Sequence, residues 1–404
     1  MKKYLLAAAV SAALAAPAHA SLFNVNINAG GQSQSYGFGN AADAIDTLDL
    51  SAIERQITEA GGAFDRHSSA ASVGIDYRGI DLGANYAENS QVLHFRIAAL
   101  GINESFNGAT REESMDMLKE WLKGEGGSAV NRLNQALVAS SPFDPLAGNP
   151  SSLMANMVDG AFDYANDVGV VGNQGTENTF NMSVSYGQYS IAGKDVETYR
   201  VPLSYTIRFD NDLMKGHRLQ FRAPLSYTEI DGHGKSYTVT LGVGYTFPVP
   251  FIDGLEMTPA FDYGVMGSED LYSAAAMKAF SLTTRYEFSL LGQDFAISNS
   301  LADLSTDSIS YEDIEVDAGL SNRAMTNGIM WKPAAPGNFR IQAFLRDTRY
   351  SGDELYSERS NEVGVSLGHK RASIFGNPVF VGASYFFTDR DDLDGFKVNF
   401  GASF

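Results

Sequence analysis

Apolar and polar residues alternate one by one along most of the C-terminal half of the chain. Between Tyr237 and Phe247, for example, every second residue is Tyr, Val, Leu or Phe, and Thr or Gly stands between them. Successive side chains of a β-strand point to opposite sides, so this period of two indicates strands with one apolar and one polar face. The pattern predicts strands at residues 178–190, 196–209, 217–229, 235–249, 255–266, 271–288, 293–304, 315–332, 338–350, 360–372, 378–388 and 394–404.

The number and length of these segments favour a membrane barrel. Twelve strands is an even number, which a closed up-and-down barrel needs if both of its ends are to lie on one side. Many segments reach the ~9–11 residues with which a tilted strand crosses a bilayer. We therefore predict an all-β fold, a transmembrane up-and-down antiparallel barrel of about 12 strands. Aromatic residues that stand near strand ends, as in interfacial girdles, are Tyr199, Phe209, Tyr227, Tyr237, Phe247, Phe288 and Tyr350.

Some residues do not fit an ideal barrel strand. Pro202 and Pro224 fall within predicted strands, where proline disturbs pairing. Asn299, Asn322 and Asn327 interrupt the apolar face of the seventh and eighth strands. A soluble β-sandwich or propeller, whose strands also alternate, is the alternative fold.

The connections between the predicted strands fall into two alternating classes. One class carries acidic residues, as in 351–360 and 388–395, and the other carries Pro and Gly, as in 248–254 and 332–337. A barrel with two chemically different ends explains this segregation. With both barrel termini in the periplasm, the acidic connections would lie outside the cell.

The first twenty residues have the pattern of a secretory signal peptide. Lys2 and Lys3 precede an apolar stretch from Tyr4 to Ala16, and Ala18–Ala20 fits an A-x-A cleavage site. The alternative, an uncleaved anchor, would need a run of ~20 apolar residues. We expect cleavage after Ala20 and export of the chain.

Composition excludes several classes of function. The 404 residues include no cysteine, which excludes disulfides and thiolate metal sites. The formal net charge of −19 argues against nucleic acid as a partner, because phosphate contacts require clustered Lys and Arg. Charged residues make up only 19% of the chain and hydrophobic residues 44%. No segment after the signal peptide is apolar enough for a transmembrane helix.

The last predicted strand carries the most specific signal. Apolar residues alternate with Lys397, Asn399, Gly401 and Ser403, and an aromatic residue stands at position 404. This resembles the C-terminal signature of Gram-negative outer-membrane proteins. The resemblance implies recognition by the barrel-assembly machinery and a cell outer membrane location, among outer-membrane lipid and lipopolysaccharide. The residues that match the signature are Phe396, Val398, Phe400, Ala402 and Phe404.

The pattern divides the chain into a signal peptide (1–20), a small N-terminal α/β portion (21–109), a helical linker or plug (110–177) and the barrel (178–404). Ser51 and Glu54 form a capping box that opens a helix through Glu59. Residues 71–98 suggest two or three small strands. Residues 110–113 are a second helix start, and we find no internal repeat in the N-terminal portion.

The segment before the barrel predicts a helix over residues 151–167. Asp159, Asp163 and Asp167 follow one another at intervals of four, which stacks the three carboxylates on one face. We hypothesise that this helix lies in the pore and that its acidic face pairs with arginines of the lumen. A solvated acidic helix outside the pore is the alternative. The arginines with inward parity are Arg200, Arg208, Arg218, Arg222, Arg285, Arg340 and Arg346.

A signal peptide, a portion without a barrel period, a helical connector and a C-terminal barrel together resemble the autotransporter architecture. The resemblance covers Ser151 to Phe404, and residues 21–150 lack the long repeat array of a usual passenger. It implies a solitary autotransporter-like barrel that translocates, displays or is plugged by its own N-terminal segment. A passive porin, or a solute-specific channel with an arginine-lined lumen, is the second hypothesis.

A third hypothesis is a hydrolase at the barrel rim. The nearest candidate is His233 with Asp231 and Glu229, joined by Asp389 and Asp391, but no nucleophile motif accompanies them. We therefore expect no enzymatic activity and no cofactor. Residues 389–395 superficially resemble a calcium loop, but Leu393 stands where a ligand oxygen is required, so we predict no metal site. The other histidines of the exported chain are His67, His94, His217 and His369.

Overall fold

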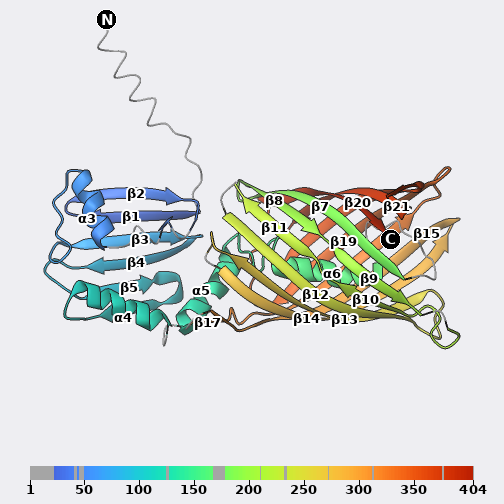
Figure 1. The fold of residues 1–404 in the computed structure, drawn as a ribbon, viewed down its shortest axis with the longest axis horizontal. Helices are drawn as coiled ribbons and strands as arrows, with labels where there is room; N and C mark the ends of the chain where they lie inside the picture. The colour runs from blue at the N-terminus through green and yellow to red at the C-terminus, as the bar shows by residue number, and fades with distance from the viewer. Residues whose placement is uncertain are drawn as a thin grey trace, which may run out of the picture. The chain divides into compact units, whose positions relative to one another are not determined.

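The computed structural model describes residues 22–40, 43–44, 50–123, 127–166, 178–209, 211–231, 234–271, 273–311, 314–374 and 377–403. The predicted signal peptide, Asp167, His233 and Phe404 lie outside these residues. The chain forms two compact units, Met1–Ala98 with Asn103–Ser114 and Ala99–Ile102 with Met115–Phe404 (Figure 1). No helix in the described part of the chain is long and apolar enough to cross a membrane.

The first unit is built on a six-stranded antiparallel sheet with the order β2-β1-β3-β4-β5-β6. On β1, Val25 and Ile27 are buried while the asparagines between them face the other side. Helix α3 contacts β1 and buries Ile53 and Ile57, because these apolar residues recur at helical spacing. The elements are β1 (Phe23–Ala29), β2 (Gln32–Phe38), α3 (Leu50–Glu59), β3 (Ala71–Tyr77), β4 (Ile80–Tyr86), β5 (Leu93–Ile97), η1 (Ala98–Leu100), β6 (Ile102–Phe106) and the start of α4 (Arg111–Lys123).

A buried arginine ties two loops of this unit together. Arg111 is 2% exposed, and its guanidinium donates to the carbonyls of Ser90 at 2.8 Å and Ser69 at 2.6 Å. It also donates to the carbonyls of Arg66 and Ala87 at 3.1 and 3.0 Å. Backbone carbonyls thus satisfy the buried guanidinium, as burial of a charge requires.

The tyrosine beside this arginine is part of the same arrangement. The Tyr86 ring lies 4.8 Å from the Arg111 guanidinium, and its hydroxyl donates to the Arg111 carbonyl at 2.8 Å. Burial raises the pKa of Tyr86 to about 12. The neutral phenol is therefore the form that the fold stabilises.

The second unit is a closed antiparallel barrel, which confirms the predicted fold class. The wall has twelve strands, because the pairs β8 with β9 and β10 with β11 are each one strand broken at a proline. Pairing of β22 with β7 closes the wall. The segments are β7 (Thr179–Ile191), β8 (Lys194–Val201), β9 (Leu203–Arg208), β10 (Arg218–Arg222), β11 (Leu225–Ile230), β12 (Gly234–Pro248), β13 (Leu255–Ser268), β14 (Ser273–Leu290), β15 (Gln293–Asp307), β18 (Ser321–Lys332), β19 (Phe339–Gly352), β20 (Arg359–Ile374), β21 (Asn377–Thr388) and β22 (Leu393–Ser403).

The breaks explain how the wall tolerates its two prolines. Pro202 has no amide hydrogen to donate, but its carbonyl accepts from the Ser183 amide at 3.2 Å. The Pro224 carbonyl accepts from Thr240 at 3.1 Å. The expected eighth strand, 315–332, begins later than predicted, at Ser321. Residues before it form a separate hairpin of β16 (Ile309–Tyr311) and β17 (Ile314–Val316).

The outer wall carries an apolar band between two aromatic girdles. On β12, Tyr237, Val239 and Leu241 are exposed, whereas Thr238 and Thr240 between them are buried inside. From Tyr237 to Phe247, ten steps of ~3.3 Å along a strand tilted by ~40° give a height of about 25 Å. This matches the apolar band of a membrane barrel.

Ring contacts mark the two girdles. At one end the contacts run through Tyr186, Tyr199, Tyr227 and Tyr237, with ring centroids 5.2 to 6.1 Å apart. At the other end Tyr286, Phe288 and Phe295 stack in a row. Tyr350 was wrongly expected in a girdle. It has the inward parity of Arg346 and Thr348 and packs against the buried apolar cluster inside the barrel.

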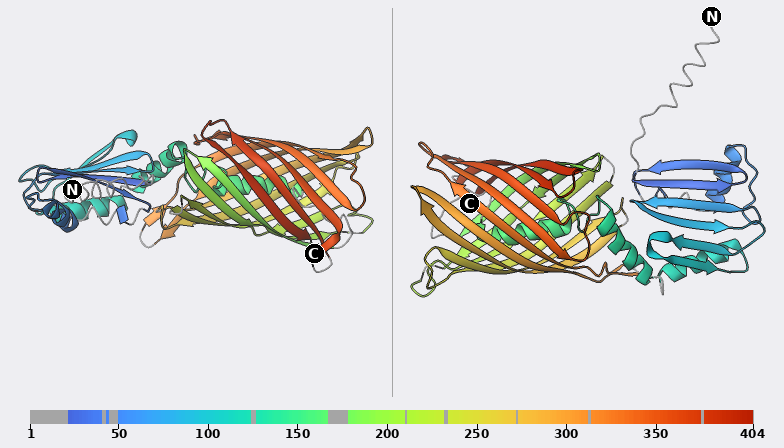
Figure 2. Two further views of the ribbon diagram at one scale, coloured as in Figure 1. Left: turned by 90° about the horizontal axis from the view of Figure 1, so that it is seen from above. Right: turned by 180° about the vertical axis from the view of Figure 1, so that it is seen from behind.

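The barrel has two distinguishable ends. We call the end formed by residues 192–193, 231, 269–271, 308–311, 314–320, 353–358 and 389–392 the acidic rim, after the acids in these connections. We call the other the terminal end, because β7 begins and β22 ends there. Helix α6 (Leu153–Asn166) lies inside the barrel, as Figure 1 and Figure 2 show, and α5 (Gly127–Ser140) precedes it.

Candidate functional site

Helix α6 runs through the lumen from the acidic rim toward the terminal end. Before its first turn, the Leu153 amide donates to the Pro145 carbonyl at 2.9 Å, and Leu146 packs in a buried cluster with Leu355 of the rim. Near its last turn, the Asn166 side chain accepts a hydrogen bond from Ser298 on β15. The helix has 14 residues, or about 21 Å at ~1.5 Å per residue, and so crosses most of the apolar band.

One side of the lumen near the rim is apolar. Inward positions of β14, β15 and β18 carry alanine, methionine or leucine, and these side chains pack against the first two turns of α6. An apolar helix face buried against an apolar stretch of wall excludes water from between the two. The cluster contains Leu146, Leu153, Met154, Met157, Ala161, Met277, Ala279, Ala302, Leu304, Leu320, Ala324 and Leu355.

Glycines of the wall make room for the large side chains of α6. A Cβ added at Gly244 would stand 2.6 Å from the Tyr164 ring, and one at Gly264 would stand 2.7 Å from Leu153. Gly328 lies in the same way beneath the ring of Phe162. The wall is thus shaped to hold the helix, because side chains at these positions would displace it.

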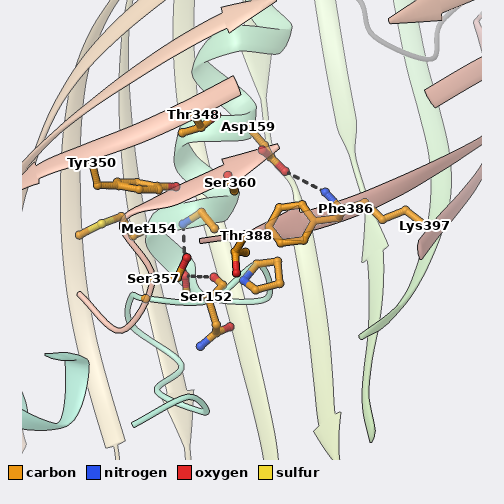
Figure 3. Close-up of a pocket in the computed structure, with 14 residues that line it drawn as sticks. Ser152, Met154, Asp159, Thr348, Tyr350, Ser357, Ser360, Phe386, Thr388 and Lys397 are labelled. Atoms are coloured by element: carbon orange, nitrogen blue, oxygen red, sulfur yellow. Dashed lines mark hydrogen bonds and ion pairs between the residues drawn. The ribbon is translucent and has the colours of Figure 1, made fainter. Parts of the chain in front are cut away.

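Asp159 is the centre of an ion-pair network between α6 and the wall strands β8, β19 and β22. Its carboxylate lies 2.8 Å from Arg346, 3.1 Å from Arg200 and 3.6 Å from Lys397. Figure 3 shows Asp159 and Lys397 facing one another. These three cations come from β19, β8 and β22, so one carboxylate connects strands from both sides of the β7–β22 closure.

Glu362 on β20 completes the network. It accepts from Lys397 at 3.3 Å and from the Ser384 hydroxyl at 2.6 Å, and it also pairs with Arg346. The Asp159 side chain is 17% exposed and the Glu362 side chain 7%. Charges this far removed from water need such partners.

Asp163 makes a weaker pair one turn further along α6. Its carboxylate lies 3.8 Å from Arg222 and is 33% exposed. Arg222 also donates to the Gly160 carbonyl, and its guanidinium lies 4.9 Å from the Tyr164 ring. The Tyr164 hydroxyl donates to Asp262 at 2.9 Å. Arg222 therefore holds α6 through the Gly160 carbonyl as much as through the Asp163 carboxylate.

The seven arginines predicted from parity divide into groups. Arg200, Arg222 and Arg346 meet α6, as described. Arg218 instead forms a two-pronged pair with Glu256 at 2.8 and 2.9 Å, and Arg285 lies 3.7 Å from the same carboxylate. The pairs of Asp159 and Asp163 do not include Arg208 or Arg340, which occupy inward positions of β9 and β19.

Sequence reasoning missed Lys397 and Glu362. Both were within reach of the same parity argument, since Phe396, Val398 and Phe400 face outward and Lys397 stands between them. The parity of Val363 and Val365 places Glu362 inward in the same way.

The acids proposed for a rim hydrolase have other partners. Asp231 pairs with Lys194 at 3.3 Å, and Asp389 accepts from the Ser357 hydroxyl at 2.7 Å. Glu229 accepts from the Tyr227 hydroxyl at 2.5 Å. Across the described residues, no group of three or more His, Cys, Asp or Glu side chains could hold a metal ion.

The remaining predicted histidines are spread over the chain. His67 lies 3.9 Å from Glu112 and His94 contacts the Ser105 hydroxyl, both in the first unit. His217 contacts the Tyr245 hydroxyl at 2.7 Å, and His369 packs edge-on against Phe339 in the girdle. The structure brings none of the four together.

Two cavities remain beside the helix. The larger, of about 140 Å³, lies between α6 and the wall that carries Arg200, Arg346 and Glu362, and it is lined by both polar and apolar side chains. The smaller, of about 30 Å³, lies nearer the rim between Ser152, Tyr350 and Lys397 (Figure 3). A cavity of this measure needs roughly 10–15 Å³ to hold a water molecule, so both have room for water.

Comparisons with known proteins identify similar barrels. The sequence matches no protein-family model and no curated protein. The translocator domain of the autotransporter NalP from Neisseria meningitidis is 9% identical with a TM-score of 0.46, covering 62% of this chain and 95% of that one. The β-domain of the Bordetella autotransporter BrkA is 14% identical with a TM-score of 0.41, covering 56% and 98%. An outer membrane channel from Pseudomonas putida F1 is 8% identical with a TM-score of 0.42, covering 58% and 97%.

Closure of the wall, the apolar band and the two girdles make the second unit a transmembrane β-barrel of the outer-membrane type. Only helices and closed barrels satisfy every backbone hydrogen bond within a bilayer. The closed wall encloses a lumen, as in a pore, and α6 fills most of that lumen.

Proposed function

We propose that the barrel is of autotransporter type and holds its own N-terminal segment across the outer membrane, with the first unit displayed at the cell surface. The observation that carries this proposal is the path of α6. The helix enters at the acidic rim, and its last residue, Asn166, points toward the end where β7 begins. The chain before α6 therefore leaves the barrel at the rim.

The orientation of the barrel follows from its ends. Outer-membrane barrels place the two termini of the wall in the periplasm and their extracellular loops at the other end. Here that arrangement turns the acidic rim outward. The barrel-assembly machinery would insert the wall, and outer-membrane lipid and lipopolysaccharide would surround it.

The packing of α6 supports a lasting plug rather than a transient passenger. The wall glycines Gly244, Gly264 and Gly328 and the Asp159 network both fix the helix in one position, and the apolar cluster fills the side of the lumen lined by β14, β15 and β18. The proposal gives the protein no cofactor and no enzymatic activity.

A solute channel is the second candidate function. The observation in its favour is the 140 Å³ cavity beside α6, which Arg200, Arg222, Arg346 and Lys397 line. If α6 left the lumen, these cations would face a water-filled pore and favour anionic solutes.

Single cysteines test the display of the N-terminal unit, because the chain has none of its own. We would label intact cells with a membrane-impermeant maleimide after making Ser33→Cys in the first unit and Asp391→Cys in the rim. Asp253→Cys, in a turn at the terminal end, is the matched control. All three positions are exposed.

The proposal expects labelling of positions 33 and 391 in intact cells, and of 253 only after permeabilisation. Labelling of 391 without 33 would place the first unit inside and refute display. Labelling of 253 without 391 would mean that the barrel is inserted the other way.

A further inference from the structure

One sector of the outer wall departs from the apolar band. Arg323 on β18, Arg349 on β19 and Arg359 on β20 are each 49 to 61% exposed and have outward parity. Asp303 and Asp347 stand among them. We call these five residues the arginine sector. The neighbouring strand β14 carries Phe280 and Leu282 on the same outer face, and β20 itself continues with Val363 and Val365.

The sector lies far from the girdle of the terminal end, on the rim side of the outer wall. Arg323 is eight residues from Trp331, or about 20 Å of height at ~3.3 Å per residue and a tilt of ~40°. Arg349 is ten residues from Phe339, which is about 25 Å by the same reckoning. Arg359 is equally far from His369, which packs on Phe339. All three arginines therefore lie at the rim side of the apolar band, from which their long side chains can extend to the headgroup layer.

Each arginine of the sector donates a hydrogen bond to a carboxylate through its Nε alone. Arg349 and Arg359 each donate through Nε, at 2.9 Å, to the two oxygens of Asp347. Arg323 donates through Nε to Asp303 at 2.7 Å. Within the described residues, the hydrogen bonds of these three side chains run through Nε and none involves a terminal Nη group. One aspartate thus holds two guanidiniums side by side, and their Nη donors make no hydrogen bond to the described residues.

The other side of the barrel has the opposite chemistry at the rim. There Glu197 accepts from the hydroxyls of Tyr186 and Tyr199, and Glu229 accepts from Tyr227. On a chain with a formal charge of −19, three arginines against two aspartates make a local positive excess. Guanidiniums bind phosphate oxygens through paired N–H groups, and this is the donor geometry that the Nη atoms leave open.

We propose that the arginine sector binds the phosphorylated headgroup of a glycolipid in the outer leaflet, of the lipid A class. The proposal rests on the outward orientation of the acidic rim proposed above. The lipid's acyl chains would lie on the apolar band below, and its phosphate would accept from Arg349 and Arg359, with Arg323 beside it.

Lipid retention by the full chain tests the proposal. The protein would be purified in detergent and titrated with bisphosphorylated lipid A or with chemically dephosphorylated lipid A, and bound lipid would be counted by native mass spectrometry. We expect wild type to retain the phosphorylated form and the Arg349→Gln/Arg359→Gln variant to bind it about tenfold or more weakly. Lys215→Gln/Lys332→Gln removes the same charge near the terminal end and should bind as wild type.

Equal binding of both lipids, or equal binding by the arginine variant, would overturn the proposal. Migration before and after heating verifies that each barrel is folded, and Arg323→Gln provides a milder variant with a smaller expected loss. If the arginine variant instead changed the oligomeric state in lipid-free detergent, the sector would be an interface between copies of this chain. Maleimide labelling of Ser33→Cys in the same variant keeps this result separate from display.

Discussion

Substitution of Asp159 by Asn tests whether charge pairing holds the plug. The change keeps the shape of the side chain and removes the charge that three cations approach within 2.8 to 3.6 Å. Arg346 and Lys397 would retain only Glu362, and Arg200 would lose its pair. Removing one partner of a buried ion pair costs ~3–5 kcal/mol, which would raise the undocked population of α6 by roughly 10²–10⁴-fold.

Single-channel recording in a planar bilayer measures this effect. We expect D159N to show larger and more frequent openings than wild type, with a preference for anions because uncompensated cations line the pore. D163N is the matched control. Its carboxylate is 33% exposed and 3.8 Å from Arg222, so the pair is worth about 0–1 kcal/mol, and conductance should change little. Wild-type conductance and gating in folded D159N barrels would refute the claim that the network holds the helix.

Three further predictions concern packing and the first unit. Gly244→Ala should push α6 from its seat by ~1–3 kcal/mol and raise conductance, whereas Gly267→Ala, with no atom within 4 Å of the added carbon, should not. Arg111→Met should destabilise the first unit by at least about 1–3 kcal/mol, because four carbonyls lose their donor, and limited proteolysis should then cut it faster than an Arg96→Met control. The raised pKa of Tyr86 predicts stability that is complete below its unfolded pKa of ~10 and lost as pH rises through about 12. Circular dichroism of the Tyr86→Phe variant should lack this alkaline step, and an identical step in both proteins would contradict the assignment.

The wall of the barrel could be predicted because alternation depends on one physical rule. Each outward residue meets lipid and each inward one meets the lumen, so parity alone placed Arg200, Arg222 and Arg346 inside. The same rule separates the three asparagines that weakened the pattern. Asn299 and Asn327 face outward and bond to each other at 2.6 Å, whereas Asn322 is buried inside against the Asp353 carbonyl.

Some features were missed although parity could have given them, and others could not be derived from it. Tyr350 has the inward parity of Arg346, but it was assigned to a girdle because it is an aromatic residue near a strand end. Parity gives no partners, and the long-range pairing of Asp159 with Lys397 depends on closure of the whole wall. The alternation of β1 was present in the sequence, since Phe23, Val25 and Ile27 are all buried, but a single short strand is a weak signal without its neighbours.

The position of Asp159 has a consequence for assembly of the wall. The carboxylate belongs to a segment that precedes the first strand, Arg200 belongs to the second wall strand, and Lys397 belongs to the last. The β7–β22 closure lies between the strands that supply these two cations. A helix already in the lumen would therefore attract both edges of the open sheet before they meet. The plug would then act as a template that lowers the entropic cost of joining the first and last strands.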